Sequence, residues 1–121
     1  MMLKSCATLL LAFAVATAQE VKKPEKLAPY YPTPESVVLK MLQLGGLKKG
    51  ERMFDLGSGD GRLVIMAAEK FGAIATGIEM DEDLYKQSTA RIRSLGLEKT
   101  ARIIKGGIAA QDFSSADMLT V

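Results

Sequence analysis

The stretch Asp55-Leu56-Gly57-Ser58-Gly59-Asp60-Gly61 decides the fold of this 121-residue chain. It follows a short apolar run, and glycines at every second position let a strand turn sharply into a helix whose backbone can approach a ligand without Cβ atoms in the way. A second acidic residue, Glu79, stands eighteen positions after Gly61, and such an acceptor can hold two ribose hydroxyls. The stretch therefore predicts a pocket for a nucleoside-containing cofactor.

The hydrophobic pattern around this loop alternates between short strands and amphipathic helices. Strands are predicted at 52–56, 75–79, 101–105 and 117–121, and helices follow the first two strands, from 63 to 72 and from Asp81 or Glu82 to 96. Strand and helix in this spacing imply right-handed crossovers and a parallel sheet with ligands at the carboxyl ends of the strands. Because the first and fourth strands of such a sheet pair at its centre, we expect 52–56 and 117–121 to be neighbours.

A further helix is predicted ahead of the first strand. Thr33-Pro34-Glu35 has the character of a helix start, with Thr33 as the N-cap, Pro34 at the first helical position and Glu35 favourably placed against the helix dipole. Gly45-Gly46 is expected to end this helix.

Residues 1–18 differ from the rest of the chain. They carry one cation, Lys4, then an uncharged run of apolar and small residues ending in Ala16-Thr17-Ala18, as in a secretory signal peptide or an N-terminal membrane anchor. Residues 19–29 are polar and proline-bearing and suit a linker, so the folded domain is expected over 30–121. An exported or membrane-tethered location follows, with a cytoplasmic one as the alternative.

The composition excludes several kinds of site. The chain has no histidine, and its one cysteine, Cys6, lies in the predicted leader, which argues against zinc sites, disulfides and histidine-based triads. Sixteen basic and fourteen acidic residues leave a net charge of +2, without the dense basic face that a nucleic-acid footprint needs.

The register of the third glycine separates two kinds of cofactor. A dinucleotide fingerprint wants glycine at 57, 59 and 62, but position 62 is Arg62 and the glycine stands at 61. Asp55, just ahead of the loop, would repel a pyrophosphate. The same carboxylate would favour S-adenosylmethionine, which has a cationic sulfonium and an amino group. An NAD-type oxidoreductase therefore remains only the less favoured alternative.

With an acidic residue ahead of Gly-x-Gly-x-Gly, residues 30–121 resemble the class I S-adenosylmethionine-dependent methyltransferases. Tyr31-Pro32-Thr33-Pro34 and Asp-Leu-Gly-Ser-Gly-Asp-Gly-Arg-Leu-Val-Ile look most like the branch of protein-lysine methyltransferases of the ATP synthase c-subunit type and their bacterial relatives. The resemblance implies a Rossmann-like, three-layer αβα fold and a methyl acceptor that could be a protein lysine. The family's sheet has seven strands, so the chain is expected to be truncated after its fourth.

The resemblance also implies a role for each residue of the pocket. Asp55 would organise the methionine amino end, directly or through water, and Glu79 would take the ribose diol. Met80 would pack on adenine, with ordinary core packing as the alternative, and Thr33 would contact the methionine portion, with a plain helix cap as the alternative. The remaining cofactor-binding residues are those of the loop, where the first three supply close backbone contact and the last two shape its entry into the helix: Gly57, Ser58, Gly59, Asp60 and Gly61.

The chain departs from the family pattern after its third strand. Gly107 stands where the family usually has an acidic residue that accepts from the adenine amino group, and Asp112 could substitute only if the loop shifts. Tyr30, Tyr31 and Asp117 are candidates for a catalytic base by position alone, so no catalytic base is assigned. These departures leave a further alternative open, an exported binding or vestigial module without catalysis.

Overall fold

The computed structural model describes residues 31–121. The predicted leader at 1–18, the linker at 19–29 and Tyr30 lie outside the described residues. Within the described part, no helix has the length and the apolar character that crossing a membrane requires.

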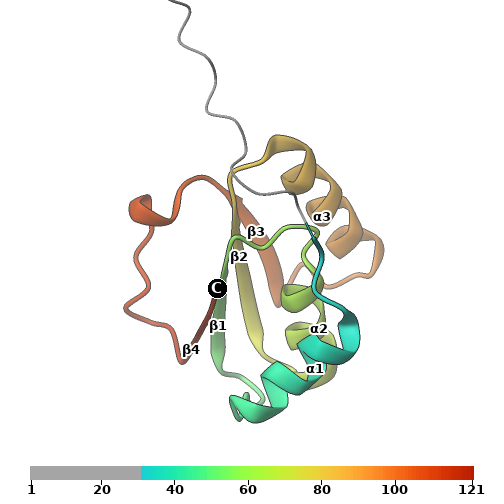
Figure 1. Cartoon of the computed structure of the whole chain (residues 1–121), viewed down its shortest axis with the longest axis vertical. Helices are drawn as coiled ribbons and strands as arrows, with labels where there is room; N and C mark the ends of the chain where they lie inside the picture. Colours follow the sequence, from blue (N-terminus) through green and yellow to red (C-terminus); the bar gives the residue numbers. More distant parts are fainter. Residues whose placement is uncertain (1–30) are drawn as a thin grey trace, which may run out of the picture.

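A parallel sheet forms the centre of the domain, as the sequence predicts. Its strands are β1 (Arg52–Leu56), β2 (Ile74–Glu79), β3 (Ala101–Lys105) and β4 (Met118–Thr120). They lie in the order β3-β2-β1-β4 (Figure 1), so β1 has a neighbour on each side. The register of β1 against β4 pairs Asp55 with Thr120, which confirms the expected pairing of the first and fourth strands.

The α-helices of the described chain cover one face of this sheet (Figure 1). They are α1 (Glu35–Leu44), α2 (Arg62–Phe71) and α3 (Glu82–Ser94). The middle helix, α2, carries a run of buried side chains from Leu63 to Ala68, and this run packs against inward-facing strand residues such as Met53 and Ile103. The loop at 57–61 lies where β1 passes into α2, and the core behind both elements holds it in place.

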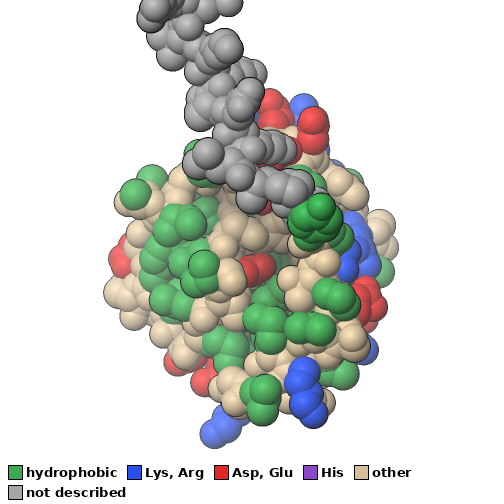
Figure 2. Space-filling model, in the orientation of Figure 1, with side chains coloured by type: hydrophobic (Ala, Val, Ile, Leu, Met, Phe, Trp, Pro, Cys, Tyr) green, Lys and Arg blue, Asp and Glu red, His purple; other side chains and the backbone are tan. Residues whose placement is uncertain are grey.

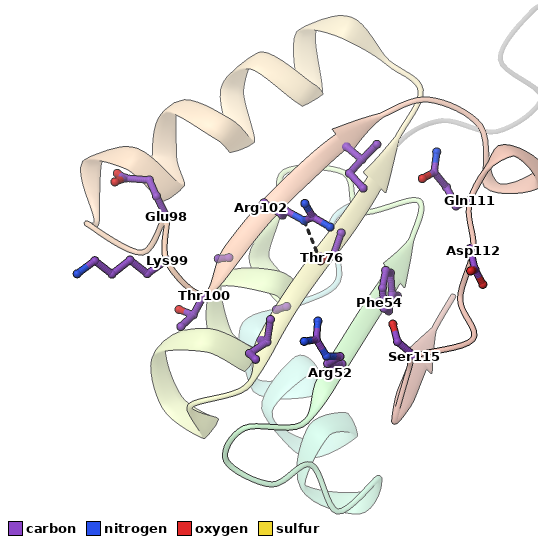
Figure 3. A pocket seen from close by; sticks show the side chains of 14 residues that line it. Arg52, Phe54, Thr76, Glu98, Lys99, Thr100, Arg102, Gln111, Asp112 and Ser115 are labelled. Atoms are coloured by element: carbon purple, nitrogen blue, oxygen red, sulfur yellow. Dashed lines mark hydrogen bonds between the residues drawn. The ribbon is translucent and has the colours of Figure 1, made fainter.

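The other face of the sheet carries the segment 106–117, with its short 3-10 helix η1 (Ile108–Ala110). Phe113 from this segment meets Phe54 of β1 edge-on, with ring centroids 5.5 Å apart. Between the segment and the sheet lies a hollow of about 550 Å³, with Arg52, Arg102 and Thr76 among the side chains that line it (Figure 3). A long hydrogen bond of 3.5 Å joins Arg102 to the Thr76 hydroxyl.

The helix ends follow their sequence signals with one exception. Gly45 caps the end of α1, Gly72 closes α2 at a φ of 66°, and Asp81 caps α3 by accepting a 3.0 Å hydrogen bond from the Leu84 N–H. The prediction of Thr33 as the N-cap of α1 is wrong. The cap position is Pro34, whose ring nitrogen carries no hydrogen and whose side chain has no acceptor, so the cap residue itself makes no side-chain hydrogen bond to this helix.

Candidate functional site

The glycine loop makes a tight reversal that only glycine adopts without strain. Gly57, Gly59 and Gly61 have φ values of 83°, 57° and 82°, in the left-handed region that side chains disfavour. The N–H groups of Gly57 and Ser58 both donate to the Ile78 carbonyl at 2.9 Å. The loop is therefore tied to the end of β2, and these two residues can offer a ligand their backbone surface but not those N–H groups.

A cleft of about 300 Å³ opens above this loop. It brings together most of the residues that the sequence predicts for the site: Thr33, Asp55, Gly57, Ser58, Gly59 and Asp60. Tyr31, Met41 and Val121 also line it. Figure 2 shows hydrophobic side chains on both sides of this region, with an acidic side chain visible between them. The lining thus combines apolar side chains, such as Met41 and Leu63, with polar groups that include the carboxylate of Asp55.

Asp55 lies at the end of β1 with only 4% of its surface exposed. Its Oδ1 accepts a 2.8 Å hydrogen bond from the Thr120 hydroxyl on β4. Burial raises the pKa of Asp55 to about 6, while the bond from Thr120 lowers it and the charge of Glu79 raises it. Near neutral pH the carboxyl is therefore mostly ionised, but burial makes its charge costly until a cation approaches.

Glu79 ends β2 and holds two neighbouring loops together. Its Oε1 accepts from the Gly59 N–H at 2.8 Å, and its Oε2 accepts from the Asp81 N–H at 3.0 Å. Each carboxylate oxygen has a second lone pair, so Glu79 can still accept from a ligand hydroxyl beside the loop. Met80 follows with 73% of its surface exposed. It is therefore not a core residue, and its contact with adenine stays a prediction.

Arg62 links the loop to the segment ahead of α1. Its guanidinium donates to both carboxylate oxygens of Asp60, the shortest contact being 2.6 Å, and it also donates to the Thr33 carbonyl at 2.8 Å. The hydrogen bond from Arg62 holds the pKa of Asp60 below its usual range. Asp60 is thereby committed to structure, which leaves Asp55 and Glu79 as the acids available to a ligand.

Close packing behind the loop depends on Gly77 in β2. A Cβ at Gly77 would come within 2.5 Å of the Ser58 Cβ and within 2.7 Å of the Ile103 Cδ1. Ser58 is 5% exposed, and its hydroxyl has no hydrogen-bond partner among residues 31–121. Gly61 meets α3 in the same way, since a Cβ there would lie 3.0 Å from the Ser88 Cβ. The loop therefore needs glycine for close contact as well as for φ.

Six sequence candidates within the described part of the chain are not among the residues that line the cleft: Gly61, Glu79, Met80, Gly107, Asp112 and Asp117. Asp117 accepts from the Arg52 N–H at 2.8 Å, at the amino ends of β1 and β4, so this candidate for a catalytic base lies away from the cleft. Asp112 lines the hollow on the other sheet face and accepts from the Ser114 N–H, so it does not substitute for an acid at position 107. Gly107 itself has open space around its Cβ position.

Arg62 and Thr120 belong to the site but were not predicted as site residues from the sequence. In the sequence, Arg62 only marks the position at which a dinucleotide fingerprint has its third glycine. Thr120 is separated from Asp55 by 65 positions, and only the pairing of β1 with β4 brings the two together. An arginine two residues after an aspartate could have indicated the Arg62–Asp60 ion pair. No local sequence pattern indicates the bond from Thr120 to Asp55.

Comparison with known proteins agrees with this geometry. Residues 55–121 match the family described as the ANTKMT methyltransferase domain. The chain belongs to this methyltransferase family. The matched range begins at Asp55 and contains the whole glycine loop, Glu79 and Thr120, so the resemblance stated from the sequence is confirmed.

Two similar proteins are longer than the part that matches this chain. A protein-lysine N-methyltransferase of Saccharolobus islandicus is 37% identical over 94 residues, which make up 77% of this chain and 58% of that protein. The solved structure of an RNA methyltransferase from Salinibacter ruber in complex with S-adenosyl-L-homocysteine is 38% identical, with a TM-score of 0.71, over 74% of this chain and 58% of that one.

A third similar protein is a methyltransferase from Thiobacillus denitrificans, again in complex with S-adenosyl-L-homocysteine. It is 26% identical with a TM-score of 0.59, over 67% of this chain and 33% of that one. The chain thus spans 58% of the length of the first two relatives and a third of the length of this one. The fold prediction, a Rossmann-like methyltransferase sheet, is confirmed by these likenesses.

Proposed function

We propose that the whole protein is an S-adenosylmethionine-dependent methyltransferase whose acceptor is a lysine side chain of a protein. The observation that carries the methyltransferase part is the buried carboxylate of Asp55 beneath a loop of three positive-φ glycines. The family match supports the same reaction.

The chemistry of the cleft fits S-adenosylmethionine better than a dinucleotide. Asp55 presents a carboxylate oxygen that a cationic amino group could pair with, and the nearest guanidinium, that of Arg62, is bonded to Asp60 and Thr33. A pyrophosphate in the same place would face the charge of Asp55 across a short distance. Glu79 sits beside Gly59 at the neighbouring strand end, where a ribose diol would reach it.

The bound cofactor would supply a methyl group activated by a positive sulfonium. An uncharged acceptor nitrogen would form a bond to the methyl carbon as the carbon–sulfur bond breaks, the bonding pair would stay on sulfur as a neutral thioether, and the methylated nitrogen would remain protonated or lose a proton to water. The contribution of this chain is placement, because aligning two bound reactants accounts for many powers of ten in rate. Asp55 and Glu79 would orient the donor from the carboxyl ends of β1 and β2, while Thr33, held through Arg62, closes one side of the cleft.

A lysine acceptor is supported by the S. islandicus relative, which is named for protein-lysine methylation. The S. ruber relative, at similar identity, is named for RNA. The modest net charge of +2 favours a protein acceptor over a polyanion, since RNA binding usually draws on a strongly basic surface. We therefore commit to a protein lysine and treat RNA as the competing outcome.

The test has a binding arm and an acceptor arm. Calorimetry of the whole protein with S-adenosylhomocysteine should show binding that Asp55→Ala and Glu79→Ala each weaken at least tenfold. Radiolabel from methyl-labelled S-adenosylmethionine should then enter lysine of protein fractions from the source cell. Binding without any transfer would favour the vestigial module, label in RNA would contradict the lysine acceptor, and no binding at all would contradict the cofactor site.

A further inference from the structure

We propose that Thr120 is a positioning residue for the methyl donor, acting through Asp55. Its hydroxyl would orient the Asp55 carboxylate and keep it ionised, so that one oxygen faces the cleft to receive the cationic amino group. This inference rests on the proposed function, because it assumes that the cleft holds S-adenosylmethionine. It adds a residue of β4 to a site whose other residues come mainly from β1, the glycine loop, β2, α1, α2 and the segment ahead of α1.

The geometry of the strand pair carries the argument. Asp55 and Thr120 are direct cross-strand partners in the parallel register of β1 and β4, and Oγ1 of Thr120 lies 2.8 Å from Oδ1 of Asp55. The Phe54 carbonyl oxygen is farther from the same hydroxyl, at 3.4 Å. A hydroxyl has a single proton to donate, and a charged acceptor at the shorter distance takes it. Oδ1 is thus held by the protein, which leaves Oδ2 for a ligand.

The charges around Asp55 explain why this bond matters. Glu79 faces it from β2 and disfavours its ionisation. Asp60 and Arg62 line the same cleft from the loop and from α2, but they are bonded to each other. Tyr31 lines the cleft from the segment ahead of α1. The bond from Thr120 therefore opposes both burial and Glu79, the two influences that would leave Asp55 protonated and unable to pair with a cation.

The expected consequence is a change in how cofactor binding depends on pH. An acid that loses a hydrogen bond to its charged form has a higher pKa, and its ionised fraction at a given pH falls. If Thr120→Val raises the pKa of Asp55 by roughly one unit from about 6, the ionised fraction falls roughly twofold at pH 7 and roughly fivefold at pH 6. The loss of affinity should therefore grow as the pH is lowered and shrink above pH 8.

The experiment compares Thr120→Val with Thr120→Ser in the whole protein. Valine keeps the β-branched shape that suits a strand and removes the hydroxyl, whereas serine keeps the hydroxyl. One readout is the titration of the Asp55 carboxyl carbon by NMR without ligand, and the other is calorimetry with S-adenosylhomocysteine from pH 5.5 to 8.5. We expect a raised Asp55 pKa and a pH-dependent loss of affinity in Thr120→Val, and neither change in Thr120→Ser.

Two results would overturn the inference while leaving the proposed function intact. One is an Asp55 titration in Thr120→Val that matches the wild type. The other is an affinity loss of equal size at every pH, which would indicate a merely structural role for the side chain. Failure of the wild-type protein to bind S-adenosylhomocysteine, with the NMR titration still shifted in Thr120→Val, would instead contradict the proposed function and, with it, any role of Thr120 in placing the donor.

Discussion

Replacing Asp55 with asparagine should stabilise the protein and weaken its ligand binding at the same time. Asparagine has nearly the same shape, and its carbonyl oxygen can still accept from the Thr120 hydroxyl at the position of Oδ1. The substitution therefore removes a buried charge without opening a cavity. The change in the free energy of unfolding caused by Asp55→Asn therefore measures how much the buried, ionised carboxylate destabilises the folded protein without ligand.

The size of that cost follows from the pKa of Asp55. A rise from 3.8 to about 6 corresponds to at most about 3 kcal/mol, at about 1.4 kcal/mol per unit. Because the folded protein binds this proton more tightly than the unfolded chain does, the wild type loses stability as pH rises from about 4 to about 6 and stays at the lower value above that. Asp55→Asn escapes this loss, so its advantage should be largest above pH 7 and vanish near pH 4.

The assay is urea unfolding of both proteins at pH 4.0, 5.5 and 7.5, with S-adenosylhomocysteine affinity measured at pH 7.5. The affinity should fall by roughly 10- to 100-fold, because a hydrogen bond to a charged group contributes about 1.5–3 kcal/mol. Asp60→Asn is the matched control. Its pKa is lowered by Arg62, so this variant should lose stability at pH 7.5. Equal unfolding free energies of Asp55→Asn and wild type at pH 7.5, or a difference that does not change with pH, would refute the reasoning.

Three further substitutions test the supports of the loop. Gly77→Ala should lower the free energy of unfolding in urea by about 1–3 kcal/mol, because its Cβ would overlap Ser58. Gly107→Ala is the control, since the position has open space and an ordinary φ of −89°, and it should change stability by less than about 0.5 kcal/mol. Equal losses in the two variants would contradict the packing argument. Glu79→Gln should lower the pKa of Asp55 in the NMR titration, since the charge of Glu79 raises it, and an unmoved titration would speak against that coupling. Arg62→Lys should speed amide exchange in residues 35–38 and weaken S-adenosylhomocysteine binding, because one ammonium cannot replace the planar guanidinium that donates to both Asp60 and Thr33. Unchanged exchange would exclude the proposed link.

Local sequence signals were sufficient for most of the fold. The strand at 52–56 was placed without error, because an apolar run ends at a glycine loop that cannot continue it. Gly45-Gly46 and Gly72 marked helix ends, since Gly46 and Gly72 adopt positive φ values of 68° and 66° that a residue without a Cβ takes without strain. The one misplaced cap, Thr33, lay one residue too early because threonine and proline both favour a helix start and the pattern could not rank them.

The residues of the candidate site were predictable where they are close in the sequence or follow neighbouring parallel strands. Asp55 and the glycines of the loop are contiguous, and Glu79 follows one crossover later, so parallel-strand topology places them at one sheet edge. Asp117 precedes the fourth strand, and a residue before a parallel strand lies at the amino end, opposite the ligand side of the sheet, so strand direction alone already argued against its candidacy. The structure places it beside Arg52, at the edge away from the cleft.

The sequence alone thus determined the kind of pocket, because glycine spacing and a preceding carboxylate are local properties that backbone sterics and charge translate directly into a ligand class. Only the tertiary structure decided how that carboxylate is held. Thr120 reaches Asp55 across 65 positions through the pairing of β4 with β1, and Arg62 divides its hydrogen bonds between Asp60 and Thr33. The bond from Thr120 to Asp55 depends on the register of two strands that are distant in the sequence, and the bond from Arg62 to Thr33 depends on how α2 packs beside the segment ahead of α1. No single stretch of the sequence specifies either arrangement.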